Sequence, residues 1–265
     1  MRKISYLVAL IVIACLFHNV SQAQMRNFTE SNGRIIEAEL LGFNDPALAA
    51  IPPQQNAAPQ HPIPRPAVAN QVTEEMKLDG WVSIFDGRTL TGWRPNKQYA
   101  GFRVQDGCIV GFGEINHLYY MAEQLKNFEL LIDAQINNSG NSGIFVKTQW
   151  EDKSFPVGFE VQINNSHHDL QKTGSLYNFV KIDKAPHEDD EWFTFHIICR
   201  GSTIECRFNG NTLYIHVDRK GNTPPREPVT RQNMQINQRG YIALQQHDPG
   251  SAPMFKNIFL KKLPD

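Results

Sequence analysis

The chain has 265 residues, of which 26 are basic and 27 acidic, so its formal net charge at neutral pH is -1. This balance lacks the basic surface typical of proteins that bind nucleic acid or anionic lipid, and it excludes both as expected partners. A neutral partner fits the composition better. A chain of this length is expected to form one main hydrophobic core.

The first residues predict export. Arg2-Lys3 precedes an apolar run over residues 6–17, and a polar stretch then ends at Ala23, the three-part pattern of a secretory signal. We therefore predict a signal peptide at residues 1–23. The apolar run is too short for a permanent membrane span. The alternative is a lipoprotein, because the residues before Cys15 resemble a lipobox. Either route gives an extracytoplasmic protein, periplasmic or secreted.

Two segments precede the main domain. Residues 24–43 contain two strand-like runs on either side of Asn32-Gly33, which predicts a hairpin that serves as an envelope tether or a docking strand. Residues 44–77 are rich in Pro, Ala and Gln, a composition typical of an extended linker. The main domain is predicted to occupy residues 78–265.

The main domain is predicted to be all-β. Short runs rich in β-branched and aromatic residues alternate with Gly, Asn and Asp, and only Met121–Lys126 suggests a helical turn. Many short strands with closely spaced turns are typical of an antiparallel two-sheet sandwich or jelly roll. The predicted strands cover residues 102–104, 108–111, 128–136, 142–148, 158–163, 193–199, 203–208, 212–217, 240–245 and 254–260.

Two tight turns and two cysteines specify local pairing. Asn209-Gly210 and Asp106-Gly107 each separate two strand-like runs, and such pairs supply the positive φ angles of a hairpin turn. A third hairpin around Gly201 makes Cys199 and Cys206 diagonal neighbours on one face. Their separation then exceeds comfortable disulfide reach, so we predict free, buried thiols.

A series of motifs carries a family resemblance. They occur in order from Gly80 to the end of the chain: residues 84–93 (IFDGRTLTGW), 102–107 (FRVQDG), 141–145 (NSGIF), 158–163 (GFEVQI), 173–177 (TGSLY), 191–192 (EW), 240–245 (GYIALQ), His247 and 255–258 (FKNI). In these motifs the domain resembles the 3-keto-disaccharide hydrolase family. The resemblance implies a concanavalin A-like jelly-roll fold and a 3-keto-glycoside substrate. Lys147 departs from the family pattern, which commonly has Arg there, and this change loses bidentate recognition.

The strand at residues 158–163 carries the first candidate site residues. Because strand side chains alternate, Glu160 and Gln162 share one face while Val161 points into the core. The polar face either lines a sugar-binding sheet or simply contacts solvent. The strand offers one carboxylate rather than the pair that ordinary glycosidases use. The ketone implied by the resemblance acidifies the hydrogen at C2, so β-elimination needs only one base, an enolate donor and an acid.

Four further residues complete the predicted site. His247 follows a strand and is either an acid/base group or a solvated rim residue. Tyr177 either contacts the sugar or belongs to the core. Asn141 is a turn former or a ligand amide. The family resemblance implies that Lys147 contacts the substrate.

The sequence thus predicts an exported hydrolase or lyase that cleaves 3-keto-glycosides, with Glu160 and His247 as catalytic residues and Asn141, Lys147, Gln162 and Tyr177 as substrate-binding residues. The alternative function is a non-catalytic carbohydrate-binding module of the same fold. No cofactor or metal is expected. The segments 167–169 (His-His-Asp) and 187–190 (His-Glu-Asp-Asp) lack a recognised metal-ligand spacing and are interpreted as solvated loops.

Overall fold

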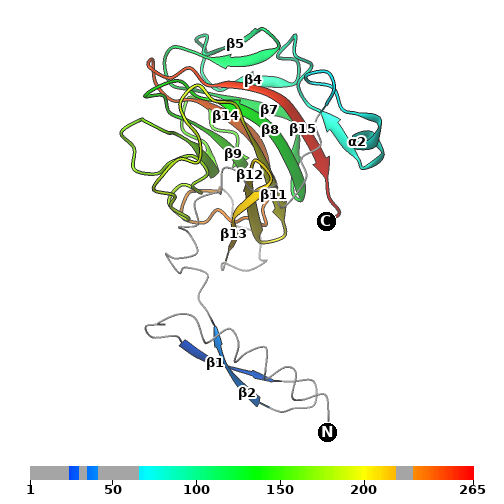
Figure 1. The fold of residues 1–265 in the computed structure, drawn as a ribbon, viewed down its shortest axis with the longest axis vertical. Helices are drawn as coiled ribbons and strands as arrows, with labels where there is room; N and C mark the ends of the chain where they lie inside the picture. Colours follow the sequence, from blue (N-terminus) through cyan, green and yellow to red (C-terminus); the bar gives the residue numbers. More distant parts are fainter. Residues whose placement is uncertain (1–23, 30–34, 41–65, 219–228) are drawn as a thin grey trace. The chain divides into compact units, whose positions relative to one another are not determined.

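The computed structural model describes residues 24–29, 35–40, 66–218 and 229–265 (Figure 1). The predicted signal peptide, Cys15 and linker residues 44–65 lie outside these ranges. The chain divides into two compact units, Met1–Leu48 and Ala49–Asp265. In the first unit, β1 (Gln24–Thr29) and β2 (Ile35–Leu40) pair as antiparallel strands. Within the described ranges, no helix combines the length and the apolar character needed to cross a membrane.

The second unit is an antiparallel sandwich of two sheets (Figure 1). The first sheet has five strands, and their order across the sheet is β10-β9-β14-β7-β4. β10 and β4 are therefore its edges. In that order the strands are β10 (Val157–Ile163), β9 (Ser142–Gln149), β14 (Gly240–Gln246), β7 (Asn116–Leu125) and β4 (Trp93–Pro95).

The second sheet has eight strands, ordered β13-β12-β11-β8-β15-β6-β5, and β3 pairs with β15 beside this path. Its central strands, β8 and β15, carry many of the core side chains. The strands are β13 (Asn211–Val217), β12 (Thr203–Phe208), β11 (Phe193–Arg200), β8 (Phe128–Gln135), β15 (Met254–Lys262), β6 (Cys108–Gly111), β5 (Phe102–Gln105) and β3 (Trp81–Ser83).

The core lies between the sheets and follows the alternation of the strands. Phe159, Val161 and Ile163 of β10 are buried in it, and so are Phe195 and Ile197 of β11. Side chains of successive strand residues point to opposite faces, so one face of each strand fills the core. The predicted all-β, concanavalin A-like sandwich is confirmed.

The predicted turns and free cysteines are also confirmed. Asn209 and Gly210 have φ angles of 46° and 81°, as a two-residue hairpin turn requires. Cys199 lies opposite Ile204, and Cys206 lies opposite Ile197, so the two thiols are diagonal neighbours. Cys108, Cys199 and Cys206 are all free and buried.

Two local predictions were wrong. Met121–Lys126 is not a helical turn, because residues up to Leu125 continue β7 and pair with β14. The predicted linker also extends too far, because its last part belongs to the sandwich. A short helix, α2 (Glu74–Leu78), is capped by Thr73 and buries Met76 against the outer face of the eight-stranded sheet.

Asn70 anchors this entry segment to the sandwich. Its side-chain nitrogen donates to the Gly107 carbonyl at 2.8 Å, and its side-chain oxygen accepts from the Asn257 backbone at 2.7 Å. The backbone N–H of Asn70 donates to the Asn257 side chain at 2.7 Å. Asn70 has a φ of 62°, a conformation that asparagine tolerates better than most residues.

We therefore expect Asn70→Ala to destabilise the sandwich by about 1–3 kcal/mol, because the partners of a buried amide lose their hydrogen bonds. Denaturant unfolding measures this change. Glu75→Ala, at an exposed helix position, is the matched control and should leave the free energy of unfolding unchanged. Equal stability of the two variants would show that residues 66–73 do not anchor the domain.

Candidate active site

A cleft of about 450 Å³ lies on the five-stranded sheet, on the face opposite the core. Strands β9, β10 and β14 form its floor, and the segments on either side of β10 and β14 form its walls. The cleft contains polar, charged and aromatic side chains together, which is typical of a site for a polar ligand. The lining residues are Asn141, Phe145, Phe155, Pro156, Gly158, Glu160, Gln162, Asp169, Tyr177, Asn178, Phe179, Arg231, Met234, Gln245 and His247.

Glu160 and Gln162 lie side by side on the floor of this cleft. Val161 between them is fully buried in the core, as the alternation of the strand predicts. Glu160 is paired with Phe145 of β9, and Gln162 with Gly143. Gly143 is required here, since a Cβ at that position would lie 2.3 Å from Glu160 Oε1. The sequence motif at residues 141–143 therefore makes room for the carboxyl group.

The Glu160 carboxyl group is poorly solvated. The residue is only partly covered, but its carboxyl group lies at the bottom of the cleft, where the protein excludes most bulk water. This desolvation raises the pKa of Glu160 to about 8, and the nearby Asp169 carboxylate adds to the increase. Such a group is largely protonated at neutral pH, and its ionised form is a stronger base than an ordinary carboxylate.

The segment after β10 returns along that strand and supplies one wall. Tyr177 N–H donates to the Glu160 carbonyl at 2.9 Å, and Gln162 N–H donates to the Ser175 carbonyl at 2.9 Å. The Tyr177 hydroxyl donates to Asp169 Oδ2 at 2.9 Å. This places the predicted residue Tyr177 at the cleft. It also adds Asp169, a second carboxylate that sequence reasoning placed in a solvated loop.

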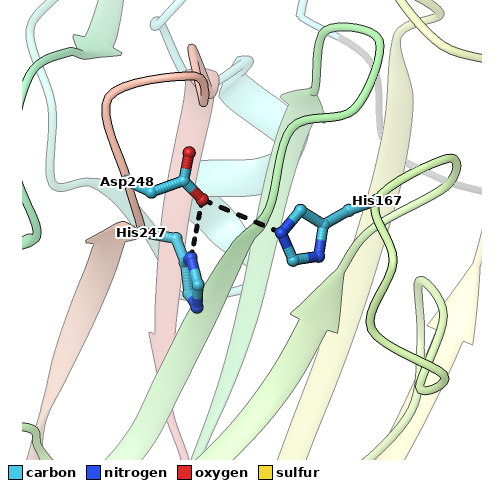
Figure 2. Close-up of side chains that lie close together, drawn as sticks. All are labelled: His167, His247 and Asp248. Atoms are coloured by element: carbon cyan, nitrogen blue, oxygen red, sulfur yellow. Dashed lines mark hydrogen bonds and ion pairs between the residues drawn. The ribbon is translucent and has the colours of Figure 1, made fainter.

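His167, His247 and Asp248 form a cluster beside the cleft, which His247 lines (Figure 2). His247 directly follows β14, as predicted, and its Nδ1 lies 2.7 Å from Asp248 Oδ2. His167 Nε2 lies 3.9 Å from the same oxygen. Each of the three side chains offers one ligand atom, and these atoms lie within 4.8 Å of one another. Among the residues that the structure describes, these three form a group that could hold a metal ion.

The burial of His167 corrects the sequence interpretation of the segment at residues 167–169. This side chain is only 9% exposed, and burial together with the neighbouring His168 lowers its pKa. His187 in the second such segment is also buried rather than solvated. Its Nε2 contacts the Thr173 hydroxyl at 2.8 Å, which fixes the segment after β10.

Asn141 links Gln162 on the cleft floor to His167. It is 1% exposed, and its amide lies 3.3 Å from the Gln162 amide and 3.2 Å from His167 Nδ1. The turn before it is made by Ser139, which has a φ of 57°, rather than by Asn141 itself. Asn141 is therefore a cleft residue and not a turn former.

Lys147 is not a cleft residue, which corrects the prediction that it contacts the substrate. It is fully buried, and its Nζ donates to the Lys126 carbonyl and lies 5.7 Å from the centre of the Phe128 ring. Its φ of 57° marks a bulge, because the pairing with β14 shifts between Phe145 and Thr148. The bulge turns the side chain away from the cleft. Burial lowers its pKa to about 8.

Arg231 and Phe155 were missed by sequence reasoning. Both line the cleft from segments outside the strands, and the Arg231 guanidinium lies 6.0 Å from the centre of the Phe155 ring. Neither residue belongs to a strand pattern or to one of the recognised motifs. Only the folded chain brings them to the site.

Comparison with known proteins identifies the family. The model of the 3-keto-alpha-glucoside-1,2-lyase-like domain matches residues 80–261. The chain belongs to this family. The matched range includes every residue of the cleft and of the His167, His247 and Asp248 cluster.

Several relatives resemble the chain over most of its length. A curated 3-keto-disaccharide hydrolase from Bacteroides thetaiotaomicron is 26% identical over 231 residues, which cover 70% of this chain and 79% of the relative. The crystal structure of a candidate glycosyl hydrolase from Parabacteroides distasonis is 25% identical, with a TM-score of 0.60, and covers 74% of this chain and 100% of its own. A second structure from that organism, at 21% identity and a TM-score of 0.53, shares the fold.

The raised pKa of Glu160 makes stability depend on pH. Because its folded pKa is about 8 and its ordinary value is 4.5, the folded state holds a proton that the unfolded state loses between these pH values. Stability is therefore lost as the pH rises through this window. Glu160→Gln removes the effect, so the variant should melt several degrees above the parent at pH 8.5 and near it at pH 4.

Thermal melts across this pH range measure the difference, and Glu114→Gln, at an exposed position, is the control. Parallel curves of melting temperature against pH for the parent and Glu160→Gln would contradict the assignment.

Proposed function

We propose that the chain cleaves the glycosidic bond of 3-keto-glycosides by β-elimination followed by hydration. Membership of the family and the named activity of the Bacteroides relative support the substrate class. The observation that carries the proposal is the poorly solvated Glu160 at the floor of the cleft, with a pKa of about 8. The carboxylate form of such a group can remove a proton from a carbon atom next to a ketone, because the ketone acidifies that proton.

The reaction balances with water as the only co-reactant. The Glu160 carboxylate removes the proton at C2, and the electron pair of that bond forms an enolate on the C3 oxygen. When the enolate collapses, the C1–O bond breaks and the leaving oxygen takes a proton from the Glu160 carboxylic acid. Water then adds across the new C1–C2 double bond, with its hydroxyl on C1 and its proton on C2. The net result is hydrolysis.

The other cleft residues have complementary roles in this proposal. The wall that contains His247 faces the C3 oxygen and stabilises the charge of the enolate. We therefore assign charge stabilisation to His247 in place of the predicted acid/base role. Asn141, Gln162 and Tyr177 orient the sugar through their amides and hydroxyl. Phe155 and Phe179 offer apolar surface to the sugar ring or to the leaving group.

The proposal includes export of the protein. The pattern at residues 1–23 supports a secretory signal, and the lipobox-like residues before Cys15 support envelope attachment as the alternative. The paired strands β1 and β2 then act as a tether or docking element. In this location the enzyme meets exported or imported 3-keto-glycosides.

Activity on paired substrates tests the proposal. The parent protein should cleave a 3-keto-disaccharide and leave the same disaccharide without the ketone intact. Glu160→Gln should lower kcat at least about a hundredfold, because it removes the group that exchanges the proton. Lys147→Met should keep full activity, since Lys147 lies outside the cleft and the two side chains have similar volumes.

Two outcomes would contradict the proposal. Cleavage of the ordinary disaccharide at a similar rate would favour a conventional two-carboxylate mechanism with Glu160 and Asp169. Tight sugar binding by the parent without turnover would favour the non-catalytic carbohydrate-binding module.

A further inference from the structure

His167 has an unexplained polar contact. The side chain is nine-tenths buried, and its Nε2 points at Asp248 Oδ2 across 3.9 Å (Figure 2). That distance is too long for a hydrogen bond. The same Asp248 oxygen lies 2.7 Å from His247 Nδ1. Two imidazoles and one carboxylate therefore converge on a small region beside the cleft.

The orientation of the Gln162 and Asn141 side-chain amides decides which ring nitrogen of His167 carries the proton. The Gln162 amide is satisfied only when its nitrogen donates to Ser142 O at 3.1 Å and to Glu160 Oε1 at 3.2 Å. The Ser142 carbonyl can only accept, so this orientation holds in either protonation state of Glu160.

The Gln162 oxygen then faces the Asn141 amide at 3.3 Å and requires a donor there. The Asn141 nitrogen meets this requirement, which leaves the Asn141 oxygen 3.2 Å from His167 Nδ1. In this orientation of Asn141, His167 Nδ1 carries the ring proton. The backbone N–H of Asp169 also approaches Nδ1, at 3.2 Å, and by itself favours the opposite tautomer. The site requires that the Asn141 contact outweighs it.

A neutral His167 with its proton on Nδ1 presents a lone pair at Nε2. The lone pair and the Asp248 carboxylate then face each other across 3.9 Å with no proton between them. That arrangement is repulsive unless a hydrogen-bond donor or a cation bridges the two groups, and a cation would satisfy both.

We propose that His167, His247 and Asp248 bind a divalent transition-metal cation. Two bonds of about 2.0–2.2 Å that meet at one ion span at most about 4.2 Å, so the gap of 3.9 Å accommodates an ion after a small closure. Two imidazoles and one carboxylate suit Zn²⁺ or Co²⁺ and leave a coordination position open. Asn141 does not contact the ion. Its side-chain oxygen accepts a hydrogen bond from His167 Nδ1 and so orients the ring, as is usual for metal-binding histidines.

The metal site extends the proposed function. Only the catalytic role of the metal ion rests on that function. His247 lines the same cleft as Glu160, so a cation held by His247 would polarise the C3 oxygen of the sugar. Metal binding itself does not depend on the identity of the substrate. It can therefore be tested without any sugar.

Titration of the chelator-treated full chain with Co²⁺ tests the site, because coordinated Co²⁺ absorbs visible light. We expect saturation at one Co²⁺ per chain. His167→Asn and Asp248→Asn should each weaken binding at least about tenfold. His168→Asn is the matched control, since it changes the adjacent, exposed histidine and should bind Co²⁺ as the parent does.

The parent protein alone can overturn the proposal, even if a variant fails to fold. Absence of the visible spectrum at millimolar Co²⁺ would show that no site exists. Unchanged binding in a folded His167→Asn variant would show that the ion binds elsewhere. Metal binding without turnover of a 3-keto-disaccharide would leave the site intact and contradict only the proposed function.

Discussion

The structure of the site depends on the backbone pairing between β10 and the segment that follows it. Residues 173–177 return along the outer edge of β10, and four N–H to carbonyl hydrogen bonds of 2.9 Å join them to residues 160–164. β10 would otherwise be an open edge of the five-stranded sheet. The returning segment covers this edge, so Glu160 no longer lies on an exposed border strand. The same pairing brings Tyr177 to the wall of the cleft.

This pairing also explains how two kinds of chemistry meet in one cleft. The segment between β10 and residue 173 is anchored at both ends, and it carries His167 and Asp169 to the site. His167 approaches Asp248, which follows β14, while Asp169 lies near enough to raise the pKa of Glu160. A poorly solvated carboxyl group therefore faces a histidine and aspartate cluster. The amides of Gln162 and Asn141 connect them.

Much of the fold follows from the local pattern of the sequence. Alternation along β10 correctly placed Glu160 and Gln162 on one face and Val161 in the core. The Asn209-Gly210 turn was also predictable, because few residue pairs adopt two positive φ angles. These features depend on neighbours in the chain, so one sequence suffices to recognise them.

The errors arise where distant parts of the chain decide the outcome. The bulge at Lys147 comes from its pairing with β14, and it moves the side chain from the expected sheet face into the protein. His167 resembles a solvated loop residue until Asn141 and Asp248 enclose it. Arg231 reaches the cleft from a segment without strand character. None of these contacts leaves a periodic signal in the sequence.

The central claim is that the cleft removes the proton at C2 of the sugar. The most direct measurement is cleavage of a 3-keto-disaccharide in D₂O, followed by NMR of the released 3-keto-sugar, with a sample without enzyme to correct for spontaneous exchange. If the proton at C2 is removed, every molecule of product should carry deuterium at C2, because water restores that hydrogen during hydration. Product that retains hydrogen at C2 would show that the glycosidic bond is cleaved directly, and would contradict the account.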